Sequence, residues 1–352
     1  MAERQLKVLI TGASGFIGSF LCEEGLRRGL QVWAGVRATS SRRWLQSEWL
    51  NVQVLDLDDP QVLGRQLAQY KAQNGRWDFV IHAAGATKCR DAEDFDRVNY
   101  EGTVHLVEQL RALDMVPQLF VYLSSLSVLG PLREPEDGYS DYPPLPRSET
   151  PQPNTAYGRS KARAEQYLQE LGEEFPHVIF RPTGVYGPRE RDYFLMAKSI
   201  ARHVDFSVGR LPQRITFVYV RDVAGAVFAA VDRCLDGGAD YVVGRTYHVS
   251  DGSVYDSRTF SDLLQRQLGV RHVLHMRAPL WMLRVVCAVS EWWAGLWGRT
   301  STLNADKYRI LRQRNWNCDI VPLKEELGYT PQWTLAEGVE ETVAWYIANK
   351  WL

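Results

Sequence analysis

A glycine-rich segment between a strand and a helix constrains the fold of this chain more than any other feature. The segment T-G-A-S-G-F-I-G covers residues 11–18, after the apolar run L-K-V-L-I-T and at the start of an apolar helical pattern. Gly12 permits a tight turn, Gly15 lets the backbone approach a pyrophosphate, and Gly18 lets helix and sheet pack closely. We therefore expect a dinucleotide's phosphates at the helix N-terminus, beside the other turn residues Ser14, Phe16 and Ile17. Without its flanking elements the same loop would be an ordinary turn.

The second expected strand, at residues 31–36, ends where folds that bind NAD usually place an acidic residue against the ribose 2′-hydroxyl. Arg37 stands there instead, and Arg42 and Arg43 follow in the same loop. Guanidinium groups suit a 2′-phosphate, so the loop favours NADP(H), with NAD(H) as the second choice. The alternative is that the three arginines only solvate a surface loop.

Two further strands are expected to reach the carboxyl edge of the sheet, where ligands of open α/β sheets bind. The run V-Q-V-L-D-L brings Asp56 and Leu57 to this edge, where Asp56 could accept a hydrogen bond from an adenine amino group. In W-D-F-V-I-H-A-A-G, His82 is interpreted as a packed residue at the strand end. The small residues that follow it leave room for a cofactor against the backbone: Ala83, Ala84 and Gly85.

Candidate catalytic groups follow in the next strand and helix. The strand at 119–125 ends in two hydroxyls, and a serine there can donate a hydrogen bond to a substrate carbonyl oxygen. Tyr157 and Lys161 lie four residues apart, which places both on one face of a helix. A nearby ammonium would lower the pKa of the Tyr157 phenol and let it exchange protons near neutral pH. Alone, this pair would be read as an ordinary solvated helix face.

Strand and helix patterns alternate from residue 6 to about 182, which predicts an α/β fold with a doubly wound, Rossmann-type parallel sheet. We assign residues 1–182 to this dinucleotide-binding domain, completed by about 217–250. Residues 183–216 and 251–352 are assigned to a smaller C-terminal substrate lobe. The Pro- and acid-rich stretch at 130–153 is interpreted as a long loop that could act as a substrate flap.

Composition excludes several other classes. The chain has 352 residues and a net charge of −1, which gives no reason to expect a nucleic-acid partner. Its five cysteines contain no C-x-x-C pair and its N-terminus leads straight into the first strand, so we expect a reduced, cytoplasmic protein without a signal peptide. His272 and His275 lack further ligands in the pattern, so no metal site is predicted.

The segment 278–298, A-P-L-W-M-L-R-V-V-C-A-V-S-E-W-W-A-G-L-W-G, is the least typical part of the chain. Arg284 and Glu291 share one helical face, and most of the remaining circumference is apolar. From residue 271 to 314, eight Lys or Arg stand against two acids, an excess that could face anionic headgroups or a substrate phosphate. Three interpretations stay open: a core or dimer-packing helix, an apolar substrate wall or membrane-surface element, and a membrane span.

Together these segments resemble the extended short-chain dehydrogenases/reductases, the NAD-dependent epimerase/dehydratase family. The motifs T-G-A-S-G-F-I-G, V-L-D-L, H-A-A-G, S-S-L-S-V-L-G, Y-G-R-S-K and R-P-T-G-V-Y-G-P stand in the family's order, and further matches continue to the C-terminus. The branch that the chain resembles most contains dihydroflavonol reductases and 3β-hydroxysteroid dehydrogenases. We also expect a homodimer.

The resemblance implies a role for each matching residue. Tyr157 would be the general acid/base, Lys161 its partner and a ribose ligand, and Ser125 the donor to the reacting carbonyl, with Ser124 and Ser127 structural. Asn99 and Pro182 would lie beside the cofactor. Substrate contacts are expected at Thr87, Ser125, Gly184 and Tyr186.

One departure from the family pattern bears on the substrate. Enzymes that act on nucleotide-sugars usually have an asparagine two residues before the tyrosine of V-Y-G-P, and this chain has Gly184 there. We therefore expect an NADP-preferring oxidoreductase in lipid metabolism that reduces a ketone on a bulky apolar substrate, or oxidises the matching alcohol. Candidates are a 3-keto sphingoid lipid, a 3-oxosteroid and a flavonoid-like ketone. The alternatives are a nucleotide-sugar epimerase, dehydratase or reductase, and a redox-inactive binding protein of the same fold.

Overall fold

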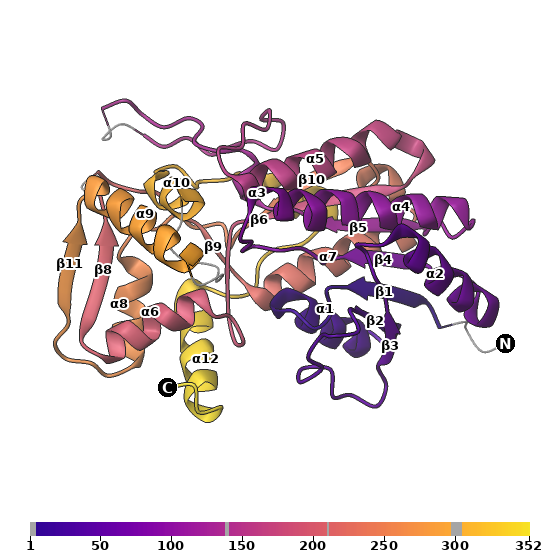
Figure 1. The fold of residues 1–352 in the computed structure, drawn as a ribbon, viewed down its shortest axis with the longest axis horizontal. Helices are drawn as coiled ribbons and strands as arrows, with labels where there is room; N and C mark the ends of the chain where they lie inside the picture. The colour runs from indigo at the N-terminus through magenta and orange to yellow at the C-terminus, as the bar shows by residue number, and fades with distance from the viewer. Residues whose placement is uncertain (1–4, 138–140, 210, 297–304) are drawn as a thin grey trace.

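The computed structural model describes residues 5–137, 141–209, 211–296 and 305–352, and the large lobe is built on one parallel sheet (Figure 1). Seven strands are paired in the order β10-β6-β5-β4-β1-β2-β3. They are β1 Lys7–Thr11, β2 Gln31–Val36, β3 Asn51–Val54, β4 Phe79–His82, β5 Leu119–Leu123, β6 His177–Pro182 and β10 Arg245–Val249. This strand order reverses direction between β1 and β4, as in a doubly wound dinucleotide fold, so the predicted fold class is confirmed.

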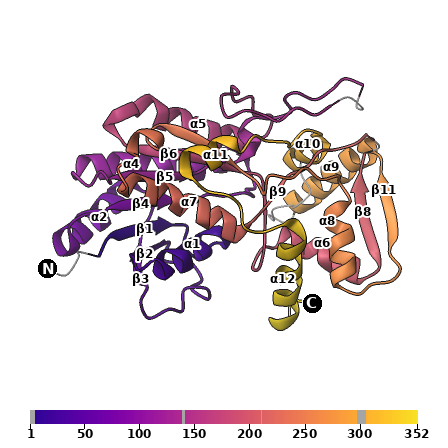
Figure 2. The same cartoon turned by 180° about the vertical axis from the view of Figure 1, so that it is seen from behind.

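Helices cover both faces of this sheet, and each strand therefore alternates between two cores. In β1, Val8 and Ile10 pack with α1 and α7, while Leu9 packs in the other core with α2 and α4. On its far side the lobe is completed by α11, which contacts α7 and β10 (Figure 2). The helices are α1 Phe16–Arg27, α2 Pro60–Asn74, α3 Ala92–Phe95, α4 Gly102–Ala112, α5 Ala156–Leu171, α7 Val220–Leu235 and α11 Val321–Leu327, with short turns at Asp96–Glu101, Leu126–Val128, Gly172–Glu174 and Ala239–Tyr241.

The smaller lobe joins the carboxyl edge of the sheet through a parallel strand pair, β7 Gly184–Tyr186 and β9 Phe217–Tyr219. A core of aromatic rings holds it together, with Phe260 centred 4.6 Å from Tyr193 and 5.0 Å from Phe217. Its elements are α6 Asp192–Ala201, β8 Val204–Val208, α8 Thr259–Gln267, β11 Leu274–Ala278, α9 Leu280–Leu296, α10 Ala305–Arg312 and α12 Leu335–Ala348.

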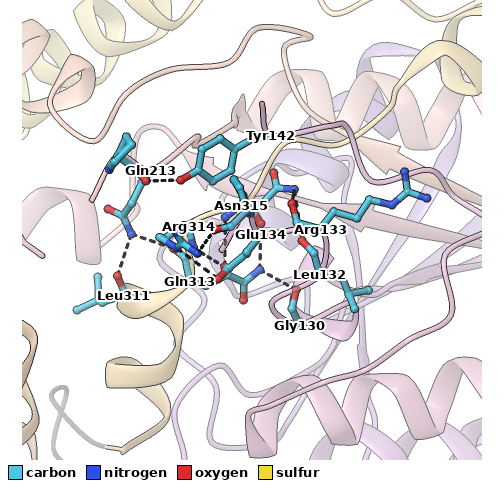
Figure 3. A network of polar contacts seen from close by, with 12 residues as sticks. Gly130, Leu132, Arg133, Glu134, Tyr142, Gln213, Leu311, Gln313, Arg314 and Asn315 are labelled. Atoms are coloured by element: carbon cyan, nitrogen blue, oxygen red, sulfur yellow. Dashed lines mark hydrogen bonds and ion pairs between the residues drawn. The ribbon is translucent and has the colours of Figure 1, made fainter. Parts of the chain in front are cut away.

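The described residues of 130–137 and 141–145 are tied by a polar network to residues 311–317, which lie far from them in the sequence (Figure 3). The fully buried Asn315 donates through Nδ2 to the carbonyls of Leu132, Arg133 and Pro143 at 3.1–3.3 Å. Gln313 donates to the Gly130 carbonyl at 2.9 Å. Because the described residues of 131–153 do not line the cavity described below, the structure does not place this loop as the expected substrate flap.

Candidate functional site

A cavity of about 1420 Å³ opens at the carboxyl edge of the sheet, between the two lobes. It runs from the glycine turn and the ends of β2, β4 and β5 to the aromatic core of the small lobe and α10. The residues expected from the sequence that line it are Gly12, Ser14, Gly15, Phe16, Ile17, Gly18, Arg37, Leu57, Ala83, Ala84, Gly85, Thr87, Ser125, Tyr157, Pro182 and Gly184. Five expected residues do not line it: Arg42, Asp56, Asn99, Lys161 and Tyr186.

The glycine turn is shaped by the backbone around it. Gly12 has φ +67°, and a Cβ there would lie 2.7 Å from the Ala83 carbonyl oxygen. A Cβ on Gly18 would lie 2.1 Å from the Gly12 carbonyl oxygen. Gly15 caps α1 without any side-chain hydrogen bond, so the helix N-terminus faces the cavity uncovered. This cradle fits the pyrophosphate of a dinucleotide.

Arginines at the end of β2 divide between the cavity and the surface. Arg37 is exposed and lines the cavity together with Ser40 and Ser41. Arg43 also lines it, with its guanidinium 4.3 Å above the Trp44 ring, whereas Arg42 does not. Of the three arginines expected near the cofactor, Arg37 and Arg43 therefore line the cavity and Arg42 does not.

Asp56 also lies away from the cavity. Its exposed carboxylate accepts the Asp58 backbone N–H at 3.1 Å, which forms a local turn after β3. Leu57 and Asp58 line the cavity in its place.

His82 is fully buried at the end of β4, in a chain of hydrogen bonds. Its Nδ1 lies 2.8 Å from Thr11 Oγ1, and its Nε2 lies 3.0 Å from Thr103 Oγ1. Burial lowers its pKa to about 3, with a smaller effect from the charge of Lys161. A neutral imidazole then links β1, β4 and α4, as the strand-end interpretation expected.

Asn99 holds the backbone that follows β4, although it does not reach the cavity itself. Its Nδ2 donates to the Ala86 carbonyl at 3.0 Å, and its Oδ1 accepts the Ala86 N–H at 2.7 Å. It lies in a π-helical turn, Asp96–Glu101, that no sequence signal indicated. Such turns occur frequently at functional sites.

The three expected catalytic residues converge from β5 and α5. Tyr157 lines the cavity and is hydrogen-bonded with Ser125. Burial raises the pKa of the Tyr157 phenol, and the hydrogen bond with Ser125 offsets this only in part. Lys161 lies below, where its Nζ donates to the Leu123 carbonyl at 2.7 Å. Burial lowers the pKa of Lys161 to about 8, although Glu165 opposes the shift.

This arrangement corrects one expectation: the pKa of Tyr157 in this structure is raised by desolvation and not lowered by Lys161. A charged network beneath the site stabilises the position of the ammonium group. Glu165 accepts hydrogen bonds from Ser124 and from Arg181, whose Nη2 lies 2.6 Å from Glu165 Oε2. Ser124 therefore has a structural partner, in line with its expected role.

Aromatic rings define the substrate end of the cavity. A Cβ on Gly184 would lie 2.6 Å from the Tyr193 hydroxyl oxygen, so Tyr193 occupies the space of the missing side chain. Tyr186 is buried behind this wall, 6.4 Å from Tyr193 between ring centroids, because α12 covers its other side at Gly338. The apolar lining comprises Met196, Ile215, Phe217, Phe260, Ile310, Leu311 and Trp316.

A charged rim, which the sequence interpretation missed, lies at the junction of α6 and α10. Asp192 is paired with both Lys88 and Lys307, and Arg191 lines the cavity beside them. On α10, Asp306 accepts the Ala156 N–H at 2.7 Å and thereby caps the helix that carries Tyr157. The only signals were charges in R-E-R-D after β7 and in A-D-K on α10.

The helix α9, which makes up most of the segment 278–298, lies outside the cavity, because none of its described residues lines it. Within the described parts of the chain, no helix is long and apolar enough to cross a membrane, and no three His, Cys, Asp or Glu side chains form a group that could hold a metal ion. Residues 297–304 lie outside the described residues.

Comparisons with known proteins agree with the geometry. Residues 8–244 match the model of the NAD dependent epimerase/dehydratase family. The chain is 25% identical to a decarboxylating sterol-4-alpha-carboxylate 3-dehydrogenase of Saccharomyces cerevisiae, covering 96% of this chain and 97% of that protein. It is 26% identical to a ceramide reductase of Caulobacter vibrioides, covering 98% and 96%. Among solved structures, a UDP-glucose 4-epimerase of Thermus thermophilus in complex with NAD superposes with a TM-score of 0.73 at 22% identity, covering 97% and 99%.

Proposed function

Because the chain belongs to the NAD dependent epimerase/dehydratase family and is an NAD(P)-dependent oxidoreductase of the short-chain dehydrogenase/reductase type, we propose that it reduces a ketone on a bulky apolar substrate, or oxidises the matching alcohol. NADP(H) is the proposed cofactor. Candidate substrates are a 3-keto sphingoid lipid, a 3-oxosteroid and a flavonoid-like ketone. A cytoplasmic homodimer, in contact with membrane lipids, is proposed with it.

The observation that carries this proposal is the aromatic wall at Gly184. Tyr193 fills the space that a longer side chain at position 184 would need, and Phe217 and Phe260 extend the wall. A ring system or alkyl chain buried against this wall would contribute about 25 cal/mol per Å², before the costs of binding are subtracted. Two relatives named for a sterol and a ceramide support a lipid-like substrate.

Different residues are proposed to bind the cofactor, to orient the substrate and to transfer the proton. The uncapped N-terminus of α1 and the glycine turn would hold the pyrophosphate, and Arg37 and Arg43 the 2′-phosphate. A bound nicotinamide supplies the hydride. Ser125 donates a hydrogen bond to the substrate oxygen, and the hydroxyl of Tyr157 supplies the proton that completes the alcohol. Lys161, whose Nζ donates to the Leu123 carbonyl, is proposed to hold the nicotinamide ribose.

The direct test measures thermal stabilisation by each cofactor and substrate, NADPH oxidation with sphingoid ketones, 3-oxosteroids and flavonoid ketones, and conversion of UDP-sugars by chromatography of the products. We expect NADPH to stabilise the protein more than NADH does, and an apolar ketone to be turned over. Turnover restricted to UDP-sugars would reject the proposal.

A nucleotide-sugar substrate is the second candidate, and the charged rim favours it. Lys88 and Lys307 gather around the carboxylate of Asp192, and Arg191 adds a third cation where a diphosphate could bind. Gly184→Asn separates the two candidates, because the new side chain displaces the Tyr193 hydroxyl. For an apolar substrate we expect a higher KM in this variant, whereas a UDP-sugar should bind as well or better.

A further inference from the structure

The outer face of α9 carries a continuous apolar stripe that no described residue covers. Trp281, Trp292 and Trp293 are 69%, 62% and 59% exposed. Between them lie four further exposed apolar side chains: Met282, Val285, Val286 and Val289. At 3.6 residues per turn, all seven side chains fall within less than half of the helix circumference.

The opposite face of the same helix is packed against the protein. Leu283 and Cys287 are buried, at 7% and 2% exposure. The helix is therefore held in place by one apolar face while it presents a second apolar face outward. Contiguous exposed apolar surface of this kind marks an interaction site more often than an ordinary solvated surface.

Exposed arginines lie on α9 and on the elements before and after it in the chain. Arg284 on α9 and Arg277 at the end of β11 are both exposed, and Arg312 is exposed on the neighbouring α10. Tryptophan rings prefer the headgroup region of a bilayer, and arginines beside them are attracted to anionic headgroups. A stripe of tryptophan and aliphatic side chains with exposed arginines on the same and adjacent elements thus matches the chemistry and charge of an anionic lipid surface.

We propose that α9 docks the protein onto the surface of an anionic bilayer, with Trp281, Trp292 and Trp293 in the headgroup region. The exposed arginines favour an anionic bilayer over a second copy of the chain, because two copies paired through this stripe would bring the same positive charges together. The helices α9 and α10 pack side by side, and Ile310 and Leu311 of α10 line the cavity (Figure 1). The use of docking to take up an apolar substrate from the bilayer rests on the proposed function.

Flotation with vesicles tests the docking without any substrate. The protein is mixed with vesicles of phosphatidylcholine alone, or of phosphatidylcholine with phosphatidylglycerol, and the bound fraction is measured. We expect binding to the anionic vesicles, weakened by salt. The triple variant W281S/W292S/W293S should bind them about tenfold less or worse. Arg277→Glu and Arg284→Glu should each lose about fivefold, and only on anionic vesicles.

Trp49→Ser is the matched control, because Trp49 is 75% exposed on the loop between β2 and β3 of the other lobe. It should bind vesicles as the wild type does. Circular dichroism and NADPH binding establish that the α9 variants are folded. Quenching of tryptophan fluorescence by brominated lipid should be lost in the triple variant and kept in Trp49→Ser.

Two outcomes overturn the proposal. In one, the wild type does not bind anionic vesicles, or Trp49→Ser weakens vesicle binding as much as the triple substitution does. In the other, sedimentation without lipid shows a dimer that the triple variant converts to a monomer, so that a second copy covers the stripe. The proposed function is judged separately, on a water-soluble ketone without vesicles. Turnover without vesicle binding rejects the docking alone, and vesicle binding without turnover of any ketone rejects the function alone.

Discussion

At the scale of single residues, Tyr157 is the side chain on which the proposed chemistry depends. Its side chain is half-buried, lines the cavity and is hydrogen-bonded with Ser125. Tyr157→Phe keeps the ring and removes the proton donor, so we expect turnover to fall by about 10²–10⁴-fold with little change in NADPH affinity. Steady-state rates and NADPH fluorescence titrations measure the two effects. A variant with wild-type turnover would show that another group transfers the proton.

The proposed preference for NADP(H) also depends on single side chains. Arg37 lines the cavity, whereas Arg42, later in the same loop, does not. Arg37→Asp replaces a guanidinium that would donate hydrogen bonds to the 2′-phosphate by a carboxylate that accepts a hydrogen bond from a free 2′-hydroxyl. The affinity for NADPH should therefore fall by about 10–100-fold, and NADH should become preferred. Arg42→Asp makes the same charge change outside the cavity and should leave the preference unaltered. Titration of both cofactors into both variants tests this, and equal effects would remove Arg37 from the site.

At the scale of elements, the strand-turn-helix unit at the N-terminus depends on close backbone contact. A Cβ on Gly18 would lie 2.1 Å from the Gly12 carbonyl oxygen, so α1 must shift away from the turn. Gly18→Ala should cost about 1–3 kcal/mol of stability or more and weaken dinucleotide binding. The control Gly102→Ala meets its nearest neighbour, the Leu57 Cβ, at an ordinary 3.5 Å and should be neutral or stabilising. Urea unfolding and NADPH titration of both variants test this prediction. Equal unfolding free energies and equal NADPH affinities in the two variants would refute it.

The buried His82, which joins β1, β4 and α4 through hydrogen bonds, predicts that the folded protein loses stability in acid. The pKa of His82 falls to about 3 in the folded protein, while an unfolded histidine titrates near 6.5. Between these values the unfolded chain binds the additional proton, so stability is lost as pH falls from about 6.5 toward 3, by up to about 1.4 kcal/mol per pH unit. His82→Gln should flatten this dependence, whereas the exposed His272→Gln should not. Unfolding free energies at pH 7 and pH 5 provide the comparison.

At the scale of the whole molecule, Asn315 ties the segment after β5 to the segment after α10 (Figure 3). Asn315→Leu leaves three carbonyls and the Asn317 N–H without their buried partner, at about 1–3 kcal/mol for each group left unsatisfied. We expect at least about 2 kcal/mol of destabilisation, measured by urea unfolding. Asn349→Leu, at the exposed end of α12, should change stability by less than about 0.5 kcal/mol. Similar losses in both would show that the network does not join the segments.

The sequence by itself determined the parallel sheet, the glycine turn and the placement of Tyr157 and Lys161 on one face of α5. These features depend on short-range physics. Strand and helix periodicity, the conformational freedom of Gly12 and the four-residue spacing on α5 are all set by neighbouring residues in the chain. The end of each parallel strand then falls at one sheet edge, because the connections of such a sheet have a fixed direction.

Only the tertiary structure decided which side chains meet in space. It placed Arg43 and not Arg42 in the cavity, and it put the Tyr193 hydroxyl in the space beside Gly184. Packing likewise buried Lys161 against the Leu123 carbonyl and left the tryptophan stripe of α9 outside the cavity. These outcomes depend on contacts between segments far apart in the chain and on the desolvation that such contacts impose, and neither is encoded in local spacing.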